Sequence, residues 1–314
     1  MKRTLALLMA VVMLAAVLAG CGQPKLEGGT LAVVGGRTIT KEDLNTRLRI
    51  YELFFQQPMD DVAKQQQVLD QMIADQVLRD QAQNLGVKAA DEQVEAEMAK
   101  FFGSLDRTYK SRTEVNQKLQ AMSLTNDDIA AFLKDFLVGQ AVTEKKKAEV
   151  TVTDEELQAF YDQKKESLYT FKEDVVRAAH VLVPLDQEAM AQEIAAKAKA
   201  GGNFADLAKL YSVDPVSSRQ GGDLGYFTRG SMVKEFSDAV FSMDPGRTSD
   251  PVRTQFGWHI IEVIDKQGPG TLPFDKAKED VRLRVLTDKQ EKAYQAWFAS
   301  VEKSSKIVKA NLGE

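Results

Sequence analysis

The sequence predicts an α+β protein, in which a block of short strands and turns stands between two helical regions. Three observations carry this prediction. Apolar residues recur at helical spacing up to Tyr161 and again from residue 274. Between these regions lie apolar runs rich in β-forming residues, 178–183 and 256–261. The only two histidines of the chain lie inside those two runs.

Length and charge narrow the class of protein. A chain of 314 residues with 44% apolar content can form two or three small domains. The net charge of −5 argues against nucleic acid as the main partner, because phosphate binding depends on concentrated lysine and arginine. No run of twenty apolar residues follows the N-terminal segment, so no internal transmembrane helix is expected.

The first twenty residues are predicted to be a signal peptide. Lys2 and Arg3 precede an apolar stretch, 5–18, whose length is typical of such signals. The stretch ends in Leu-Ala-Gly-Cys, which resembles a bacterial lipobox and implies cleavage before Cys21 and lipidation (palmitate among the acyl chains) on its sulfur. An ordinary signal peptide with an incidental cysteine is the alternative. Since Cys21 is the only cysteine, no intramolecular disulfide is expected.

The N-terminal elements follow from turn and cap signals. Residues 21–30 are a polar tether, and 31–39 are predicted to form a hairpin with Gly35-Gly36 as its two-residue turn. Thr40 with an acidic residue three positions later predicts a capping box at the start of a helix that Pro58 ends. A long helix is predicted over 62–85, with Gly86 as its C-terminal cap.

Further helices are predicted from the spacing of apolar residues. They are expected from Asp91 through Phe102, around 114–122, over 126–147 and from Asp154, with a polar connection at 105–112. After the strand-rich block, 267–270 is predicted to be a linker and 274–301 a long amphipathic helix. Such a helix must bury its apolar stripe, and the N-terminal helices are the expected partner.

The strand-rich block carries four separated signatures in order. They are His-Val-Leu-Val at 180–183, Asn-Phe-Ala-Asp-Leu-Ala at 203–208, Gly-Gly-Asp-Leu-Gly at 221–225 and Phe-Gly-Trp-His-Ile-Ile at 256–261. With these signatures, residues 173–266 resemble the parvulin family of peptidyl-prolyl cis/trans isomerases. The resemblance implies a four-stranded, mainly antiparallel sheet with surrounding helices.

The layout of the whole chain resembles the SurA-like chaperones and the PrsA-type foldase lipoproteins, in which a parvulin domain is inserted in an α-helical chaperone domain. The organisation expected from this resemblance is an N-terminal helical chaperone domain at 31–172, a parvulin domain at 173–266, and a C-terminal helical segment at 267–314 that packs on the N-terminal domain.

The implied reaction needs no proton removal and no covalent intermediate. Rotation about an Xaa-Pro bond meets a barrier of about 20 kcal/mol that comes from amide resonance. A catalyst must therefore favour the twisted amide, by gripping the proline ring in an apolar pocket and by placing polar groups for the twisted state.

The resemblance assigns site residues one by one. It gives catalytic roles to His180, Asp214 and His259, and substrate-binding roles to Leu224, Met232, Phe236, Thr254 and Phe256. The chain departs from many members at position 233, where Val233 replaces a glutamine, so a polar substrate contact of those members is unsupported here.

Each assignment has a structural alternative. Met232 and Phe236 have the near-helical spacing of core residues. A histidine in a strand is usually a hydrogen-bonded core residue, and the two histidines here are expected to shape the site and not to transfer protons. Asp214 either orients a histidine, disfavours the planar amide, or is a solvated loop residue.

The sequence thus predicts a membrane-anchored extracytoplasmic foldase that acts on unfolded or newly secreted proteins. The alternative is a holdase whose parvulin domain binds peptide without turnover. No zinc motif, hydrolase elbow, P-loop or dinucleotide fingerprint is present, so neither a metal nor another cofactor is implied. The lack of a basic cluster makes a preference for phosphorylated substrates unexpected, and the sequence leaves open whether the protein forms a homodimer.

Overall fold

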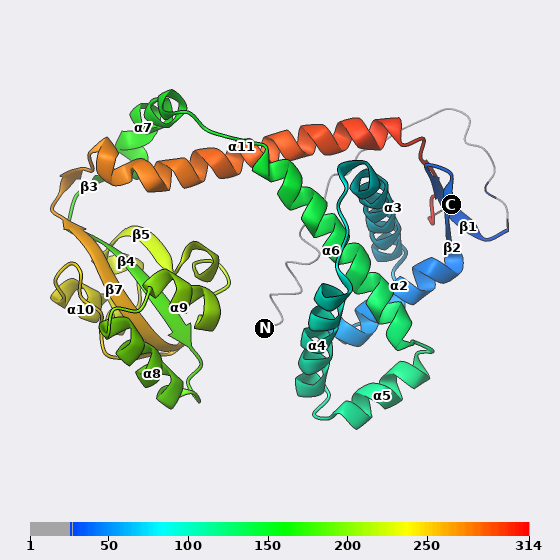
Figure 1. The fold of residues 1–314 in the computed structure, drawn as a ribbon, viewed down its shortest axis with the longest axis horizontal. Coiled ribbons are helices and arrows are strands. Elements are labelled where there is room, and N and C mark those ends of the chain that lie inside the picture. Colours follow the sequence, from blue (N-terminus) through cyan, green and yellow to red (C-terminus); the bar gives the residue numbers. More distant parts are fainter. Residues whose placement is uncertain (1–25, 27, 314) are drawn as a thin grey trace. The chain divides into compact units, whose positions relative to one another are not determined.

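The computed structural model describes residues 26 and 28–313 and divides them into two compact units (Figure 1). One unit combines the chain up to Thr151 with the segment from Thr287 onward, and the other spans Val152–Leu286. In this described part of the chain, no helix has both the length and the apolar character needed to cross a membrane.

The first unit begins with a small antiparallel sheet. Strands β1 (Thr30–Val34) and β2 (Arg37–Thr40) form the predicted hairpin, and the positive φ angles of Gly35 and Gly36, 58° and 87°, suit its two-residue turn. Strand β9 (Val308–Lys309), from the far end of the chain, pairs with the other edge of β1. The sequence did not predict this third strand.

Five helices follow within the described chain, namely α2 (Lys41–Phe55), α3 (Val62–Leu85), α4 (Asp91–Thr108), α5 (Arg112–Ala121) and α6 (Asn126–Ala148). The predicted capping box of Thr40 and Asp43 starts α2, and Gly86 ends α3 in the left-handed conformation. The predicted connection at 105–112 is wrong in part. Helix α4 continues to Thr108, because Leu105 is buried in the core and holds the last turn in place.

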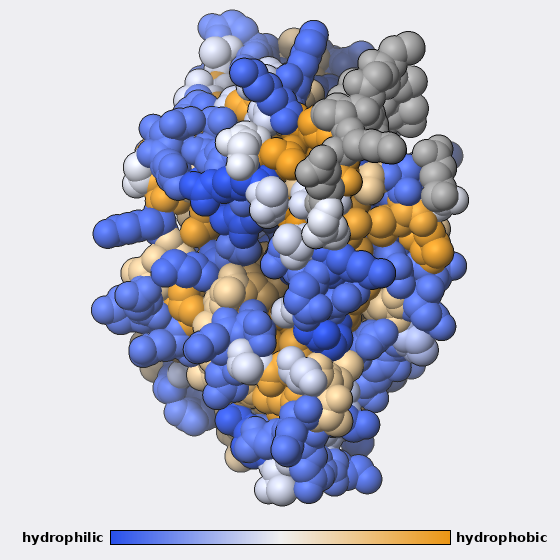
Figure 2. Space-filling view, turned by 90° about the vertical axis from the view of Figure 1, so that its right-hand side faces the viewer, coloured by the Kyte–Doolittle hydropathy of each residue, from blue (hydrophilic) through white to orange (hydrophobic). Residues whose placement is uncertain are grey.

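Helix α11 (Phe274–Ser304) runs through both units, and its second half completes the core of the first. Tyr294 and Phe298 are buried in the same apolar cluster as residues of α2, α3 and α6. The amphipathic C-terminal helix thus finds the partner that its apolar stripe requires. Figure 2 faces the first unit and shows hydrophobic patches on a mostly hydrophilic surface.

The second unit contains a four-stranded sheet in the order β5-β4-β7-β6, with every pair antiparallel. Its strands are β4 (Val175–Val183), β5 (Asp223–Thr228), β6 (Val252–Thr254) and β7 (Gly257–Gln267). This confirms the predicted fold class, an α+β domain with a four-stranded sheet joined to a helical domain.

Helices cover both faces of this sheet (Figure 1). Side chains alternate along β4, so Val181 and Val183 pack against α8 (Glu188–Lys199) and α9 (Phe204–Tyr211). Val176 and Ala178 face the other way, toward α10 (Lys234–Ser242). His180 is two residues after Ala178 in β4 and therefore lies on the same face of the sheet, the face that α10 covers.

A further apolar cluster lies at the start of α11. There Leu157 and Tyr161 of α7 (Asp154–Leu168) pack with Val281 of α11. The predicted linker at 267–270 is wrong in part, because β7 extends to Gln267 and β8 (Gly270–Thr271) pairs with β3 (Thr170–Phe171). The predicted domain boundaries at 172/173 and 266/267 stay a prediction.

Candidate functional site

Two neighbouring strands bring the two histidines together. Strands β4 and β7 pair so that Leu182 stands opposite His259 and His180 opposite Ile261. This register places the two rings diagonally on the same face of the sheet. Their Nδ1 atoms are 3.0 Å apart, the rings stack at 25° between planes, and both side chains are buried.

The other nitrogen of His180 faces two oxygen atoms of the loop after α9. Its Nε2 lies 3.0 Å from Asp214 Oδ2 and 3.1 Å from Ser217 Oγ, and the Ser217 hydroxyl donates to the same carboxylate oxygen at 2.5 Å. The sequence reasoning missed Ser217. Its one available signal was a small hydroxyl residue three positions after Asp214, a spacing that lets both side chains meet within one turn.

Two hydrogen bonds hold this loop against the end of β4. The Val213 N–H donates to the Leu182 carbonyl at 2.8 Å, and the Leu182 N–H donates to Ser212 Oγ at 3.0 Å. Because both the N–H and the carbonyl of Leu182 bind this loop, Asp214 approaches His180 from a defined direction.

At the other end of the pair, His259 contacts the turn between β6 and β7. Its Nε2 lies 2.9 Å from the buried Thr254 Oγ1. The same hydroxyl oxygen accepts the backbone N–H of Phe256 at 3.1 Å. Phe256 is 61% exposed, so this residue contributes its backbone to the network and leaves its side chain at the surface.

The partners assign the protons of the two histidines. An ionised Asp214 only accepts, so His180 donates its Nε2–H to the carboxylate, and a neutral ring then accepts at Nδ1. His259 must donate its Nδ1–H across the pair, which leaves its Nε2 to accept the hydroxyl proton of Thr254. Every nitrogen of the two rings thus has a partner while both rings are neutral.

Burial supports this charge state. Desolvation, with a smaller contribution from the nearby His180, lowers the pKa of His259 to about 4. Burial alone would raise the pKa of Asp214, but the hydrogen bonds from Ser217 and His180 outweigh it and lower that pKa below its usual value. At neutral pH the site therefore holds an ionised Asp214 carboxylate and a neutral His259 imidazole.

An apolar cluster lies beside the histidines. We call it the Phe236 cluster. Its buried members are Val176, Ala178, Phe227, Phe236, Val240, Ile261 and Val263. The Phe236 ring stands edge-on to both imidazoles, with centroids 5.9 Å from His180 and 5.3 Å from His259. Leu224 and Met232 pack against the same cluster and remain half-buried.

The structure thus joins Thr254, His259, His180 and Asp214 in one chain of hydrogen bonds and places the Phe236 cluster next to it. The half-buried Leu224 and Met232 can offer apolar surface to a ligand, while the polar chain can orient a carbonyl or amide dipole. Among residues 26 and 28–313, no three His, Cys, Asp or Glu side chains come together as metal ligands.

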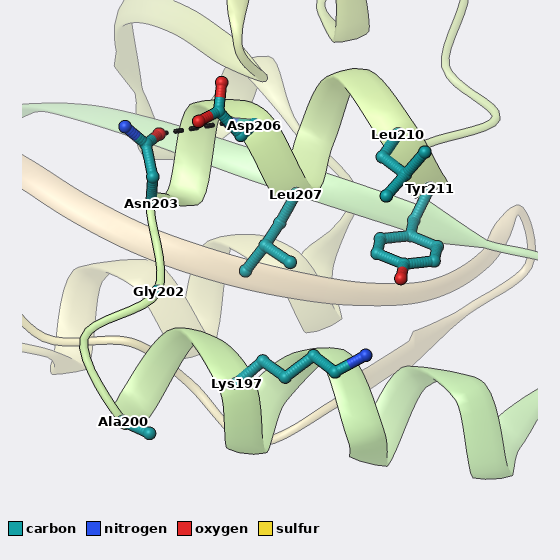
Figure 3. A pocket seen from close by; sticks show the side chains of 8 residues that line it. All are labelled: Lys197, Ala200, Gly202, Asn203, Asp206, Leu207, Leu210 and Tyr211. Atoms are coloured by element: carbon teal, nitrogen blue, oxygen red, sulfur yellow. Dashed lines mark hydrogen bonds between the residues drawn. The ribbon is translucent and has the colours of Figure 1, made fainter.

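A separate hollow of about 440 Å³ lies between α8 and α9 (Figure 3). In this view Leu207 points from α9 toward α8, where Lys197 lies. Both helices cover the face of the sheet that carries Val181 and Ile260, whereas the histidines lie on the opposite face. The hollow therefore contains none of the predicted site residues.

Comparison with known proteins divides the chain in two parts. Residues 161–267 match the model of the PPIC-type peptidyl-prolyl isomerase domain, and residues 1–143 match that of the SurA-like N-terminal domain.

Among curated proteins, the foldase protein PrsA of Caldanaerobacter subterraneus subsp. tengcongensis is 32% identical, over 98% of this chain and 97% of that protein. The foldase protein PrsA of Clostridium botulinum (strain 657 / Type Ba4) is 28% identical, over 88% and 87%. Among solved structures, the crystal structure of PrsA from Bacillus subtilis is 25% identical with a TM-score of 0.45, covering 90% of this chain and 94% of that one.

Proposed function

The chain belongs to the family of PrsA foldases and is a peptidyl-prolyl isomerase of the PPIC type, and from this premise we propose that it works outside the cytoplasmic membrane on unfolded or newly secreted proteins. It is a foldase with a SurA-like chaperone part and a parvulin-type domain. The proposal concerns where it acts, on which clients and with which residues.

The observation that carries the residue roles is the contact between the Phe236 ring and both histidines. In the proposed site, Leu224, Met232 and Phe236 grip the proline ring. The exposed ring of Phe256 contacts the segment beside the proline, and Thr254 orients His259. Twisting the amide breaks the conjugation between its carbonyl and its nitrogen. A polar group that interacts more strongly with the twisted form therefore lowers the barrier to rotation.

The histidines and Asp214 would act by orientation and electrostatics. Both rings already use each nitrogen in a hydrogen bond, so neither has a free proton to offer a substrate without breaking the chain. This fits a reaction that moves no proton. In this proposal Asp214 sets the direction of all three hydrogen bonds in the chain, because its charge requires the proton on His180 Nε2.

The catalytic proposal is tested by the cis-to-trans rate of Xaa-Pro peptides. We expect the protein to accelerate this rate. Phe236→Ala should lower the acceleration at least about tenfold, which corresponds to about 1.4 kcal/mol of lost transition-state binding. The matched control is Phe241→Ala, since Phe241 packs against the same cluster but contacts neither histidine. Circular dichroism checks that both variants fold.

Two outcomes would contradict the proposal in different ways. An equal loss in both variants would mean that the cluster only supports the fold. A folded protein without any acceleration would favour the holdase alternative, and suppression of client aggregation would then be the activity to measure.

We also propose that residues 1–20 are a signal peptide and that Cys21 carries a lipid. Cys21 lies outside the described residues, and the support is the Leu-Ala-Gly-Cys sequence at 18–21 after a signal-like apolar stretch. Two or more acyl chains give stable anchoring where a single one does not.

The anchor makes a direct prediction. Cys21→Ser should move the protein from the membrane fraction to the soluble extracytoplasmic fraction, as seen by immunoblot after cell fractionation, without changing the isomerisation rate of the purified protein. Retention of the variant in the membrane fraction would argue against lipidation as the anchor.

A further inference from the structure

Strand β5 contains a bulge beside the proposed proline pocket. Its residues Phe227 and Tyr226 pair with Val176 and Arg177 of β4, but the next pair joins Asp223 to Ala179. Two residues of β5 therefore stand opposite Ala178 alone. The ladder continues past the bulge, where the His180 N–H donates to the Gly222 carbonyl at 2.9 Å.

The bulge decides which face of the sheet Leu224 occupies. If the register of Phe227 and Tyr226 continued without a break, Leu224 would pair with Ala179, whose side chain packs against α8 and α9. A shift of one residue moves a side chain to the other face of a sheet. With the bulge, Leu224 packs against the Phe236 cluster, on the face that carries the histidines.

Two features hold the bulge in place. Gly225 adopts a φ of 67°, a left-handed conformation that costs glycine little. Its N–H donates to Asp223 Oδ1 at 2.9 Å, which closes a local turn around Leu224.

The Asp223 carboxylate is itself fixed by a neighbouring strand. Arg177 donates from Nη2 to Asp223 Oδ2 at 2.5 Å and from Nε to the same oxygen at 3.2 Å. The two side chains are only 21% and 27% exposed. A planar guanidinium held at two atoms orients a carboxylate more strictly than a single contact would.

We propose that Arg177 and Asp223 are positioning residues for the isomerase reaction: their ion pair holds the bulge that turns Leu224 toward the proline pocket. Neither residue touches the substrate. The inference rests on the proposed role of Leu224 in the pocket. It adds that a pair of charged residues on the opposite face of the sheet determines how well this pocket is formed.

The test is a series of variants assayed for kcat/KM on Xaa-Pro peptides with the full chain. Arg177→Ala should lower kcat/KM about fivefold, because it loosens the bulge without removing a group that touches the substrate. Asp223→Ala should lower it further, whereas Asp223→Asn should recover part of the loss, because its side-chain oxygen still accepts the Gly225 N–H. Lys199→Ala, which breaks the exposed pair with Asp250 in the same unit, should have no effect.

A double-mutant cycle separates positioning from general stability. If Arg177 acts through Leu224, then Arg177→Ala should lower kcat/KM by less than about twofold when Leu224→Ala is already present. Losses that multiply in the double variant would overturn the proposal, as would an unchanged kcat/KM in Arg177→Ala.

A second readout does not depend on catalysis. In methyl-labelled protein, nuclear Overhauser contacts between the Leu224 methyl groups and the ring protons of the Phe236 cluster should weaken in Arg177→Ala and persist in Lys199→Ala. Retained contacts in Arg177→Ala would overturn the inference. An inactive wild type that still shows this difference would count against the proposed catalysis and leave the role of the ion pair intact.

Discussion

At the residue scale, the site depends on keeping the buried His259 imidazole neutral beside His180. The His180 and His259 rings share one hydrogen bond between Nδ1 atoms, and this bond can hold only one proton. A further proton on His259 would place a charge in a buried position next to the apolar ring of Phe236. The low pKa of His259 is the measurable sign of that cost.

This pKa predicts that the second unit loses stability in mild acid. In the unfolded chain His259 binds a proton near pH 6.5, but in the folded chain only near pH 4. Between these values the unfolded state binds more protons, so the free energy of unfolding falls as the pH falls. The full shift corresponds to about 3 kcal/mol, lost mainly between pH 6.5 and 4.

The measurement is urea unfolding at pH 7 and pH 4.5, followed by the fluorescence of Trp258 in a Trp297→Phe background. His259→Asn should be less stable than the parent at pH 7 but should lose less stability on acidification. An equal loss in both proteins would show that another group causes the acid sensitivity.

At the element scale, the helices of the first unit are joined by an ion-pair cluster around the buried Arg47 as well as by apolar packing. Arg47 of α2 lies 2.9 Å from Asp75 of α3 and 3.8 Å from Asp135 of α6. The Arg79 guanidinium also pairs with Asp135, and the Arg47 guanidinium lies over the ring of Phe132. Three helices are thus linked through the buried guanidinium of Arg47.

Removing one partner from this cluster should be costly. Arg47→Ala leaves Asp75 without its main cation and should lower the free energy of unfolding of the first unit by about 3–5 kcal/mol. Lys134→Ala is the control, because it breaks only an exposed pair with Asp91 and should cost less than about 1 kcal/mol. Chemical unfolding followed by the fluorescence of Trp297 in a Trp258→Phe background measures both, and similar small losses would refute the prediction.

At the scale of the whole molecule, the first unit is built from both ends of the chain. The N-terminal helices need Tyr294 and Phe298 of α11 to complete their core, and β1 needs β9 at its edge. By contrast, the apolar contacts of α7 with the first half of α11 lie within the second unit.

A chain that stops after Leu286 should therefore destabilise the first unit and leave the second unit folded. It lacks the two buried aromatic side chains and β9, so the first unit should lose protection against limited proteolysis. The second unit retains its sheet and the cluster around Tyr161 and should keep its isomerase activity. Equal protease resistance of the helices in the shortened and full chains would contradict this prediction.

The sequence by itself determined most elements and the kinds of residue available for a site. Periodicity and caps are local, and for this reason α3, α6 and the hairpin turn at Gly35 follow from short windows. The motifs also identified His180 and His259 as candidate site residues, because the chemistry available to a site depends on which residue types the chain contains.

Only the tertiary structure decided the features that depend on residues far apart in the chain. The pairing of β9 with β1, the last turn of α4 and the contact of Ser217 with His180 are of this kind. So is the face on which Leu224 lies, since alternation along β5 alone would not reveal the extra residue opposite Ala178. Local patterns encode which element forms, but register and partner choice are settled when distant segments pack against one another.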